Sequence, residues 1–343
     1  MEDKKIKVGI LFGGKSAEHE ISLISTKTVY KHIDKIKFKP VLIYINKKGA
    51  WSHISKEEFE NNDFINKSYA SFLPWENNIT NKLDIDIYFP VLHGPNCEDG
   101  KLQSLLELSE KPYVGANSLS SSIAMDKVIS KILFKNAGLN TPDFLFFTYN
   151  DHLKIKDMIL KKLNYPVFIK PCSLGSSVGI SKVNEEEELK SAIDVAFKYD
   201  KKIIIEKAIN AREIEIAVMG NDNIKISKPG ELIPFNKFYD YEDKYVLGKT
   251  KFKIPTILSD KLKKEIKKMA KKAYESLFLN GMARIDFFIE KNTEELFINE
   301  INTIPGFTEI SMFPKLWEYE GIGFTDLITK LIEYGFDYHR KQK

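Results

Sequence analysis

The sequence predicts an α/β fold that opens with a doubly wound α/β domain and becomes α+β in its C-terminal part. The chain has 343 residues, which is long for one compact domain and enough for two or three domains with separate cores. It begins with an apolar run at residues 7–12, a glycine turn and a helical pattern, which is the opening of an α/β unit. Near its end, two apolar runs flank a short polar segment, as in an antiparallel hairpin.

Composition argues against several kinds of partner and location. The 52 Lys and Arg residues nearly balance the 48 Asp and Glu residues, so a net charge of +4 gives no electrostatic reason to expect nucleic acid. Two cysteines, Cys97 and Cys172, are too few for a disulfide framework and fit a reducing compartment. The apolar run at residues 8–12 is too short for a signal-peptide core, and no segment is long enough to cross a bilayer. We therefore expect a soluble, cytoplasmic protein without a membrane partner.

The first domain has two places where a ligand could bind. Further strands are predicted at residues 40–45 and 85–92, with a helical pattern at 21–32. The glycine turn at 13–16 lacks both common nucleotide-binding patterns, but Glu18 at its exit could receive a substrate ammonium or simply favour the helix N-terminus. His93 follows a strand end, where ligands bind in open α/β sheets, although a lone histidine there is more often structural.

The middle of the chain, from a boundary near Asn117, carries a second α/β pattern. A helix predicted at 122–136 precedes a strand at 167–170, a Gly- and Ser-rich tip at 175–179, and a return strand. Backbone N–H groups of such a tip can surround phosphate oxygens with Lys170 beside them, but an ordinary flexible turn would look similar. The strand at 202–206 ends at Glu206, where backbone groups could contact an adenine edge and an acid could accept from ribose.

The last part of the chain contains a long irregular segment and the hairpin. Residues 238–245 include three tyrosines, which favours a functional lid over plain disorder. A hairpin centred near Thr293 places Asp286 opposite Glu300, and Asn302 shares the face of Glu300. Three oxygen ligands without His or Cys suit Mg²⁺ or Mn²⁺. The alternative is an edge hairpin with solvated acids, which is costly for carboxylates set within apolar strands.

Seven segments, in this order, resemble the D-alanine–D-alanine ligase family of the ATP-grasp superfamily, and they span essentially the entire chain. The segments are GGKSAEHEISL, LHGPNCEDG, SSIAMDK, IKPCSLGSSVG, the tyrosine-rich segment, ARIDFF and EINTIPGFTEIS. The resemblance implies an N-terminal domain (1–117) with the first D-alanine site, a central domain (118–210) and a C-terminal domain (211–343). ATP would lie between the last two domains. The family is usually dimeric, so a homodimer is expected.

The resemblance also implies roles for single residues. Those that would contact ATP are Lys127, Lys170, Gly175, Ser176, Ser177, Glu206, Lys207, Ile209 and Glu213. Those that would hold two Mg²⁺ ions, or Mn²⁺, are Asp286, Glu300 and Asn302. Those that would contact the D-alanines or stabilise the reaction are Glu18, His93, Ser176, Lys244, Tyr245, Arg284, Gly306 and Ser311.

Within that last group the implied functions differ. Glu18 matches the residue that receives the first ammonium, and it would form a hydrogen-bonded set with Ser176 and the lid residue Tyr245. The residues that match contacts to the second carboxylate are Lys244 and Ser311. The residues that match the oxyanion donors are Arg284 and the N–H of Gly306. This role for Arg284 displaces the simpler interpretation, an ion pair with Asp286 on the same strand face.

The expected reaction is ATP-dependent ligation of two D-alanines through a D-alanyl phosphate, for peptidoglycan precursor synthesis. A D-alanine–D-lactate ligase or another ATP-grasp ligase is the alternative, although Tyr245 favours the dipeptide product because the ester-forming relatives lack it. A catalytically silent ATP-binding module would have lost a metal or oxyanion residue, yet Arg284, Asp286, Glu300 and Asn302 are all present. A nicotinamide-dependent dehydrogenase is disfavoured because the dinucleotide fingerprint is missing.

Overall fold

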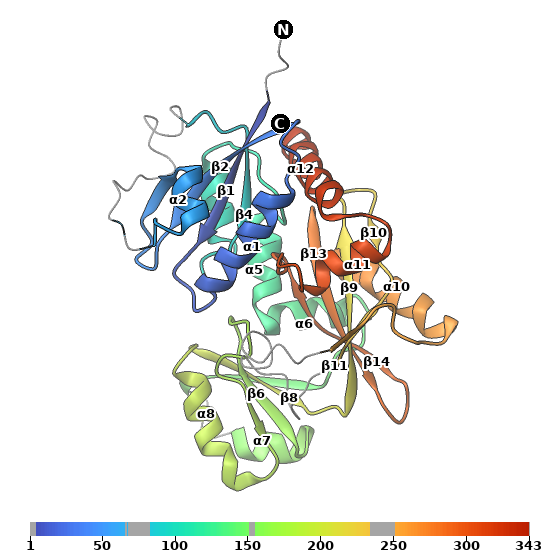
Figure 1. Ribbon diagram of the computed structural model, residues 1–343. Helices are drawn as coiled ribbons and strands as arrows, with labels where there is room; N and C mark the ends of the chain where they lie inside the picture. The colour runs from blue at the N-terminus through green and yellow to red at the C-terminus, as the bar shows by residue number, and fades with distance from the viewer. Residues whose placement is uncertain (1–4, 66, 68–82, 151–154, 234–250, 343) are drawn as a thin grey trace.

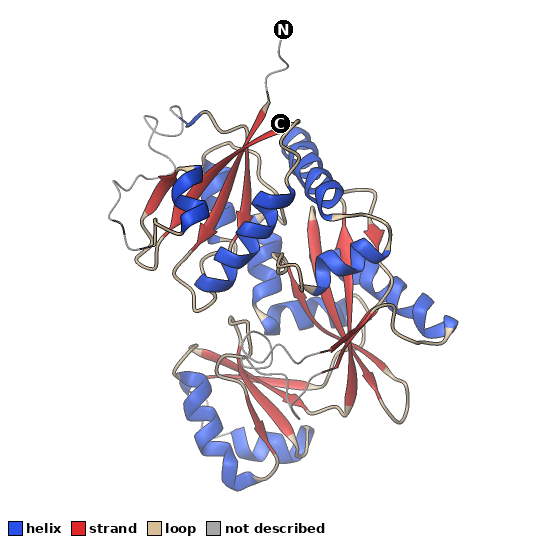
Figure 2. Ribbon diagram, in the orientation of Figure 1, coloured by secondary structure: helices blue, strands red, loops and turns tan. Residues whose placement is uncertain are grey.

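The structure, a computed structural model, describes residues 5–65, 67, 83–150, 155–233 and 251–342, which form three β-sheets covered by helices (Figure 1). One sheet lies in the N-terminal part, one in the middle and one in the C-terminal part of the chain (Figure 2). No helix among the described residues is long and apolar enough to cross a membrane.

The N-terminal sheet has the order β3-β2-β1-β4, in which β1 pairs in parallel with both β2 and β4. Its strands are β1 (Ile6–Gly13), β2 (Phe38–Ile45), β3 (Trp51–Ile54) and β4 (Ile87–Val91). The helices that accompany it are α1 (His19–His32), α2 (Lys56–Asn61) and α4 (Lys101–Leu108). The parallel pairing brings the carboxyl ends of β1 and β4 side by side, which is where open α/β sheets bind ligands.

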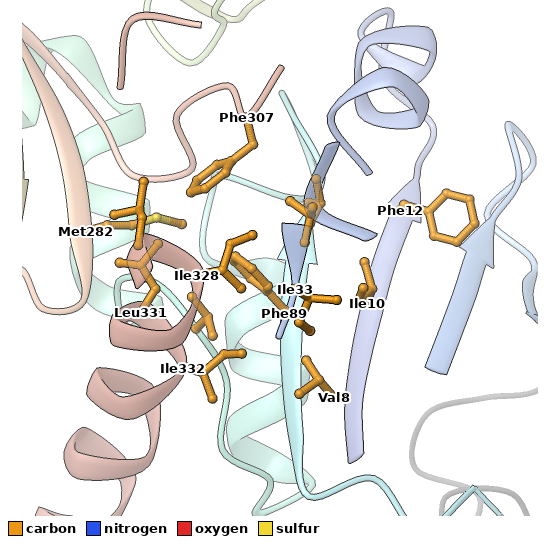
Figure 3. Packing of buried hydrophobic residues seen from close by; sticks show 14 of the residues in the cluster. Val8, Ile10, Phe12, Ile33, Phe89, Met282, Phe307, Ile328, Leu331 and Ile332 are labelled. Carbon is orange, nitrogen blue, oxygen red and sulfur yellow. The ribbon is translucent and has the colours of Figure 1, made fainter. Parts of the chain in front are cut away.

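Both faces of this sheet are buried, as a doubly wound domain requires. Alternate β1 residues, among them Ile10 and Phe12, face a core shared with α1 and the last helix, α12 (Phe324–Lys341), whereas Leu11 faces α4. Figure 3 shows Ile328 of α12 against Phe89 of β4. The end of the chain therefore returns to pack on the first sheet.

The central sheet has the order β5-β8-β6-β7 and is antiparallel throughout. Its strands are β5 (Phe144–Thr148), β6 (Val167–Pro171), β7 (Ser181–Val183) and β8 (Lys202–Lys207), with helices α7 (Ile155–Lys162) and α8 (Leu189–Phe197) and the 3₁₀ turn η2 (Glu186–Glu188). The pairing of β6 with β7 confirms the predicted hairpin around the Gly- and Ser-rich tip.

The C-terminal sheet has the order β12-β11-β9-β13-β14, and β10 pairs with β9. Its strands are β9 (Ala211–Met219), β10 (Lys225–Ile226), β11 (Gly230–Ile233), β12 (Lys251–Lys253), β13 (Met282–Glu290) and β14 (Leu296–Asn302). Helix α10 (Asp260–Ser276) covers one face through Leu262 and Ile266, and α11 (Met312–Tyr319) covers the other through Met312 and Phe313.

The segment expected to be one helix at 122–136 is two helices, α5 (Ser118–Met125) and α6 (Lys127–Asn136). Asp126 leaves the helical conformation with φ −83° and ψ 102°, and its carboxylate accepts the N–H groups of Val128 and Ile129. An aspartate in this conformation is a favoured N-cap, because it satisfies N–H groups that a new helix leaves without partners. The new start fixes Lys127 as the first residue of α6.

Candidate functional site

A cleft of about 820 Å³ is lined by residues of both the central and the C-terminal sheets. All nine positions that the family resemblance assigns to ATP line it: Lys127, Lys170, Gly175, Ser176, Ser177, Glu206, Lys207, Ile209 and Glu213. Arg284, Asp286 and Glu300 line it as well. The pattern of the sequence and the shape of the molecule therefore converge on one cavity large enough for a nucleotide.

The loop between β6 and β7 projects into this cleft in an unusual backbone conformation. Ser176 and Ser177 have φ values of 52° and 59°, in the left-handed region that residues with a side chain seldom adopt. Lys127 Nζ donates to the carbonyl oxygen of Leu174 at 2.6 Å, which ties the loop to α6. Strained backbone of this kind is typical of ligand-binding loops.

The same loop touches the N-terminal sheet. Ser176 Oγ donates to Glu18 Oε1, although 158 positions separate the two residues. Glu18 is buried at the start of α1, and Gly94, in the loop after β4, approaches it so closely that a Cβ there would lie 2.8 Å from Glu18 Oε2. The candidate acceptor for a substrate ammonium and the candidate phosphate loop are thus neighbours.

Three buried charges form a chain behind the loop. Lys170 Nζ lies 2.5 Å from Glu206 Oε2, and Lys131 Nζ lies 2.9 Å from Glu206 Oε1. Burial favours the neutral carboxyl, but the two ammonium groups outweigh it and hold the pKa of Glu206 at about 2. Sequence analysis missed Lys131, whose only signal is its position one helical turn after Lys127.

The proposed metal ligands meet on the hairpin of β13 and β14. Asp286 pairs directly with Glu300, as the turn position predicts, and Asn302 Nδ2 donates to Asp286 Oδ2 at 3.1 Å. The register then shifts by one residue, so Asn299 bulges from β14 beside Glu300. Among the described residues no three His, Cys, Asp or Glu side chains group as metal ligands, so the candidate set depends on the Asn302 amide. Two carboxylates and an amide oxygen suit a hard divalent cation that also binds substrate phosphates.

Arg284 forms the ion pair that the resemblance had displaced. Its Nε and Nη2 atoms donate to the two oxygens of Asp286 at 2.8 and 2.7 Å, and Nε lies 3.2 Å from Glu215 Oε2. Glu215 of β9 pairs with Asp286, so carboxylates of β9, β13 and β14 form a row across the sheet. The correction has a physical reason, because neighbouring carboxylates that are mostly buried need a compensating positive charge, and the guanidinium supplies it.

Three further candidate residues are among those the structure describes: His93, Ser311 and Gly306. His93 is buried, and its ring nitrogens lie 3.3 Å from Ser25 Oγ and 3.3 Å from the carbonyl oxygen of Ile304. Ser311, at the N-terminus of α11, accepts the N–H of Thr308 at 3.0 Å. A Cβ at Gly306 would lie 2.8 Å from Ser311 Oγ, so these two positions adjoin. Lys244 and Tyr245 lie outside the described residues.

The environment of His93 leads to a pH prediction. Burial lowers its pKa, but the hydrogen bond with Glu98 and the charge of Glu18 raise it, and the net direction is upward. A raised pKa in the folded state stabilises the fold below about pH 6.5, and this contribution disappears as the pH rises through the folded value. We expect the excess in unfolding free energy of wild type over His93→Gln to shrink from pH 6 to pH 9.

Chemical denaturation at several pH values measures this excess. His53→Gln is the control, because burial lowers the pKa of the His53 side chain and the trend should not appear. An excess for His93 that grows with pH would contradict the assignment.

A Gly- and Ser-rich loop on a β-hairpin, buried lysines and a carboxylate pair line one cleft between two antiparallel sheets, which is the arrangement of an ATP-grasp enzyme. Two family descriptions match the chain: "D-ala D-ala ligase N-terminus" over residues 7–116 and "D-ala D-ala ligase C-terminus" over residues 133–333. The chain belongs to the D-alanine–D-alanine ligase family. Members of this family use ATP and divalent metal ions.

Relatives and solved structures agree with this membership. A protein of Thermoanaerobacter sp. strain X514 named D-alanine–D-alanine ligase is 46% identical over an alignment of 355 positions, gaps included, that covers 99% of each chain. The structure of the D-alanine–D-alanine ligase from Coxiella burnetii superposes with a TM-score of 0.86 at 34% identity, covering 99% of this chain and 96% of that one. The VanG D-Ala:D-Ser ligase from Enterococcus faecalis gives 0.87 at 34% identity, covering 97% and 100%.

Proposed function

We propose that the chain joins two D-alanine molecules into D-alanyl-D-alanine at the expense of ATP, a step of peptidoglycan precursor synthesis. Family membership supports the reaction. The observation that carries it is the contact of Ser176 with Glu18, because a residue lining the ATP cleft there touches the candidate acceptor for the first ammonium. A ligase that activates a carboxylate with ATP needs these two sites in contact.

The first step transfers the γ-phosphoryl group of ATP to a carboxylate oxygen of the first D-alanine, and ADP leaves. Lys127, Lys170 and the N–H groups of the loop at 175–179 would hold the phosphates, while the backbone around Glu206 to Ile209 would hold the adenine. Glu213 would accept from the ribose. A divalent cation held by Asp286, Glu300 and Asn302 would neutralise phosphate charge, and we propose two Mg²⁺ ions, or Mn²⁺.

The second step is attack of the amine of the second D-alanine on the D-alanyl phosphate, with loss of a proton and of phosphate. Arg284 and the N–H of Gly306 would stabilise the tetrahedral oxyanion. Ser311, at the N-terminus of α11, and Lys244 would bind the second carboxylate. Tyr245 would close the lid by joining Ser176 and Glu18, which excludes water from an easily hydrolysed intermediate.

The proposal includes the organisation of the chain. We assign residues 1–117 to the first D-alanine site, 118–210 to the central ATP-grasp domain and 211–343 to the C-terminal domain, with His93 beside the first substrate. The cytoplasm, where ATP and the precursors occur, is the proposed location. A homodimer is the proposed assembly.

Product analysis tests the proposal directly. With ATP, Mg²⁺ and D-alanine, we expect ADP, phosphate and D-alanyl-D-alanine in equal amounts, identified by mass. A second candidate is a ligase for another second substrate, because a D-Ala:D-Ser ligase is as similar in structure as a D-alanine–D-alanine ligase. Competition between D-alanine, D-serine and D-lactate decides it. A product that is mainly the ester or the serine dipeptide would contradict the leading proposal.

A further inference from the structure

Lys131 is a buried cation that the proposed reaction does not use. It lies in α6, one turn after Lys127, and its side chain is 1% exposed. Its Nζ atom lies 2.9 Å from Glu206 Oε1 and donates to the carbonyl oxygen of Asn299 at 3.0 Å. Asn299 is the bulged residue of β14, so Lys131 spans from the central to the C-terminal wall of the cleft.

Lys131 adds a second positive charge beside Glu206. A fully buried lysine costs several kcal/mol to desolvate, and a single lysine would suffice to compensate Glu206. Lys170 already does so at 2.5 Å, and Lys170 also lines the ATP cleft. With Lys170 alone, the pair of Lys170 and Glu206 would have no net charge and would not attract a phosphate. With Lys131 added, the group of three keeps one net positive charge on the side that faces the cleft.

Burial lowers the pKa of the Lys131 ammonium and outweighs the carboxylate of Glu206, which raises it, so the net direction is downward. The geometry nevertheless favours the protonated form. Both contacts of the Lys131 nitrogen are to oxygen acceptors, one of them ionised, and such acceptors favour the ammonium over the amine. If the pair of Lys170 and Glu206 served only to stabilise the fold, it would not need a second buried lysine, and Lys170 would not need to line the cleft.

We infer that Lys131 is a positioning residue for ATP, which compensates the charge of Glu206 so that Lys170 keeps its own positive charge for the nucleotide phosphates. This inference rests on the proposed function, since it concerns the same ATP cleft. Lys131 itself lies behind Glu206 and is not among the described residues that line the cleft. Its effect should therefore depend on the phosphates of the ligand and on the charge of Glu206, and not on the adenine.

The test compares ADP and adenosine binding by calorimetry in four proteins: wild type, Lys131→Met, Lys131→Met combined with Glu206→Gln, and Lys135→Met. Lys131→Met removes one positive charge from the group formed by Lys131, Lys170 and Glu206. The added Glu206→Gln removes the negative charge and so restores the net charge of the group. Lys135, one turn further along α6, is exposed and serves as the matched control. Thermal unfolding of each protein accompanies the binding data.

We expect Lys131→Met to weaken ADP binding about tenfold, as the loss of one charge within ~10 Å at an effective dielectric constant near 20 requires, and to leave adenosine binding within about twofold. The double variant should regain most of the ADP affinity, and Lys135→Met should match wild type.

Three results would overturn the inference. They are no loss of ADP affinity in Lys131→Met, a loss of ADP affinity that adenosine shares equally, and no recovery of ADP affinity in the double variant. A wild-type protein that binds no ADP would instead overturn the proposed function itself.

Discussion

Glu300→Gln is expected to lower turnover about 100-fold or more while leaving the melting temperature almost unchanged. The carboxylate faces the cleft opposite Asp286, its side chain is 30% exposed, and its ion pair with the buried Lys127 is 3.5 Å long. Lys127 Nζ also donates to the carbonyl oxygen of Leu174 at 2.6 Å, so loss of the long pair should cost only about 1 kcal/mol of stability. As a proposed ligand of a divalent cation, however, the same carboxylate carries charge that glutamine cannot replace.

ADP release under saturating substrates, titrated with Mg²⁺, measures this effect. Turnover should fall and the Mg²⁺ concentration at half-maximal rate should rise. Glu295→Gln is the matched control, because Glu295 lies on the same hairpin and is exposed, and its side chain accepts a hydrogen bond from Asn140 Nδ2, which glutamine can also do. Wild-type turnover with wild-type Mg²⁺ dependence in Glu300→Gln would refute the metal role.

The sequence predicted the register of this hairpin but not its irregularity. Two apolar runs around one polar turn leave few alternatives for the pairing of Asp286 with Glu300, because a slip of one residue would turn every side chain to the opposite face. The bulge at Asn299 has no comparable pattern. Its carbonyl oxygen accepts from Lys131, and this long-range contact is part of how the structure accommodates the extra residue.

Contacts between residues far apart in the sequence could not be predicted from local patterns. A lysine in a helix is usually solvated, so nothing in the pattern of α6 distinguishes buried Lys131 from exposed Lys135. The contact of Ser176 with Glu18 joins two loops 158 positions apart, and it was expected only through the family resemblance. The packing of α12 on the first sheet was not predicted at all, because an apolar helix face does not specify its partner.

The carboxylates of β9, β13 and β14 give Arg284 two functions that compete. In the structure its guanidinium is held by Asp286 and lies near Glu215, which compensates one partly buried and one buried acid. In the proposed second step it would also stabilise the tetrahedral oxyanion. A divalent cation at Asp286 would take over part of the compensation, and the guanidinium could then serve the substrate.

Arg284→Lys is therefore expected to separate the two chemical steps. Lysine keeps a positive charge beside Asp286 and Glu215, so the fold should persist, but it cannot reproduce the planar fork of the guanidinium. We expect dipeptide formation to fall about 100- to 1000-fold, the range typical of a lost oxyanion donor. D-alanine-dependent positional isotope exchange in γ-¹⁸O-labelled ATP, which reports reversible acyl phosphate formation, should continue near the wild-type rate. Exchange that disappears together with dipeptide formation would assign Arg284 to phosphoryl transfer, because only that step is common to both measurements.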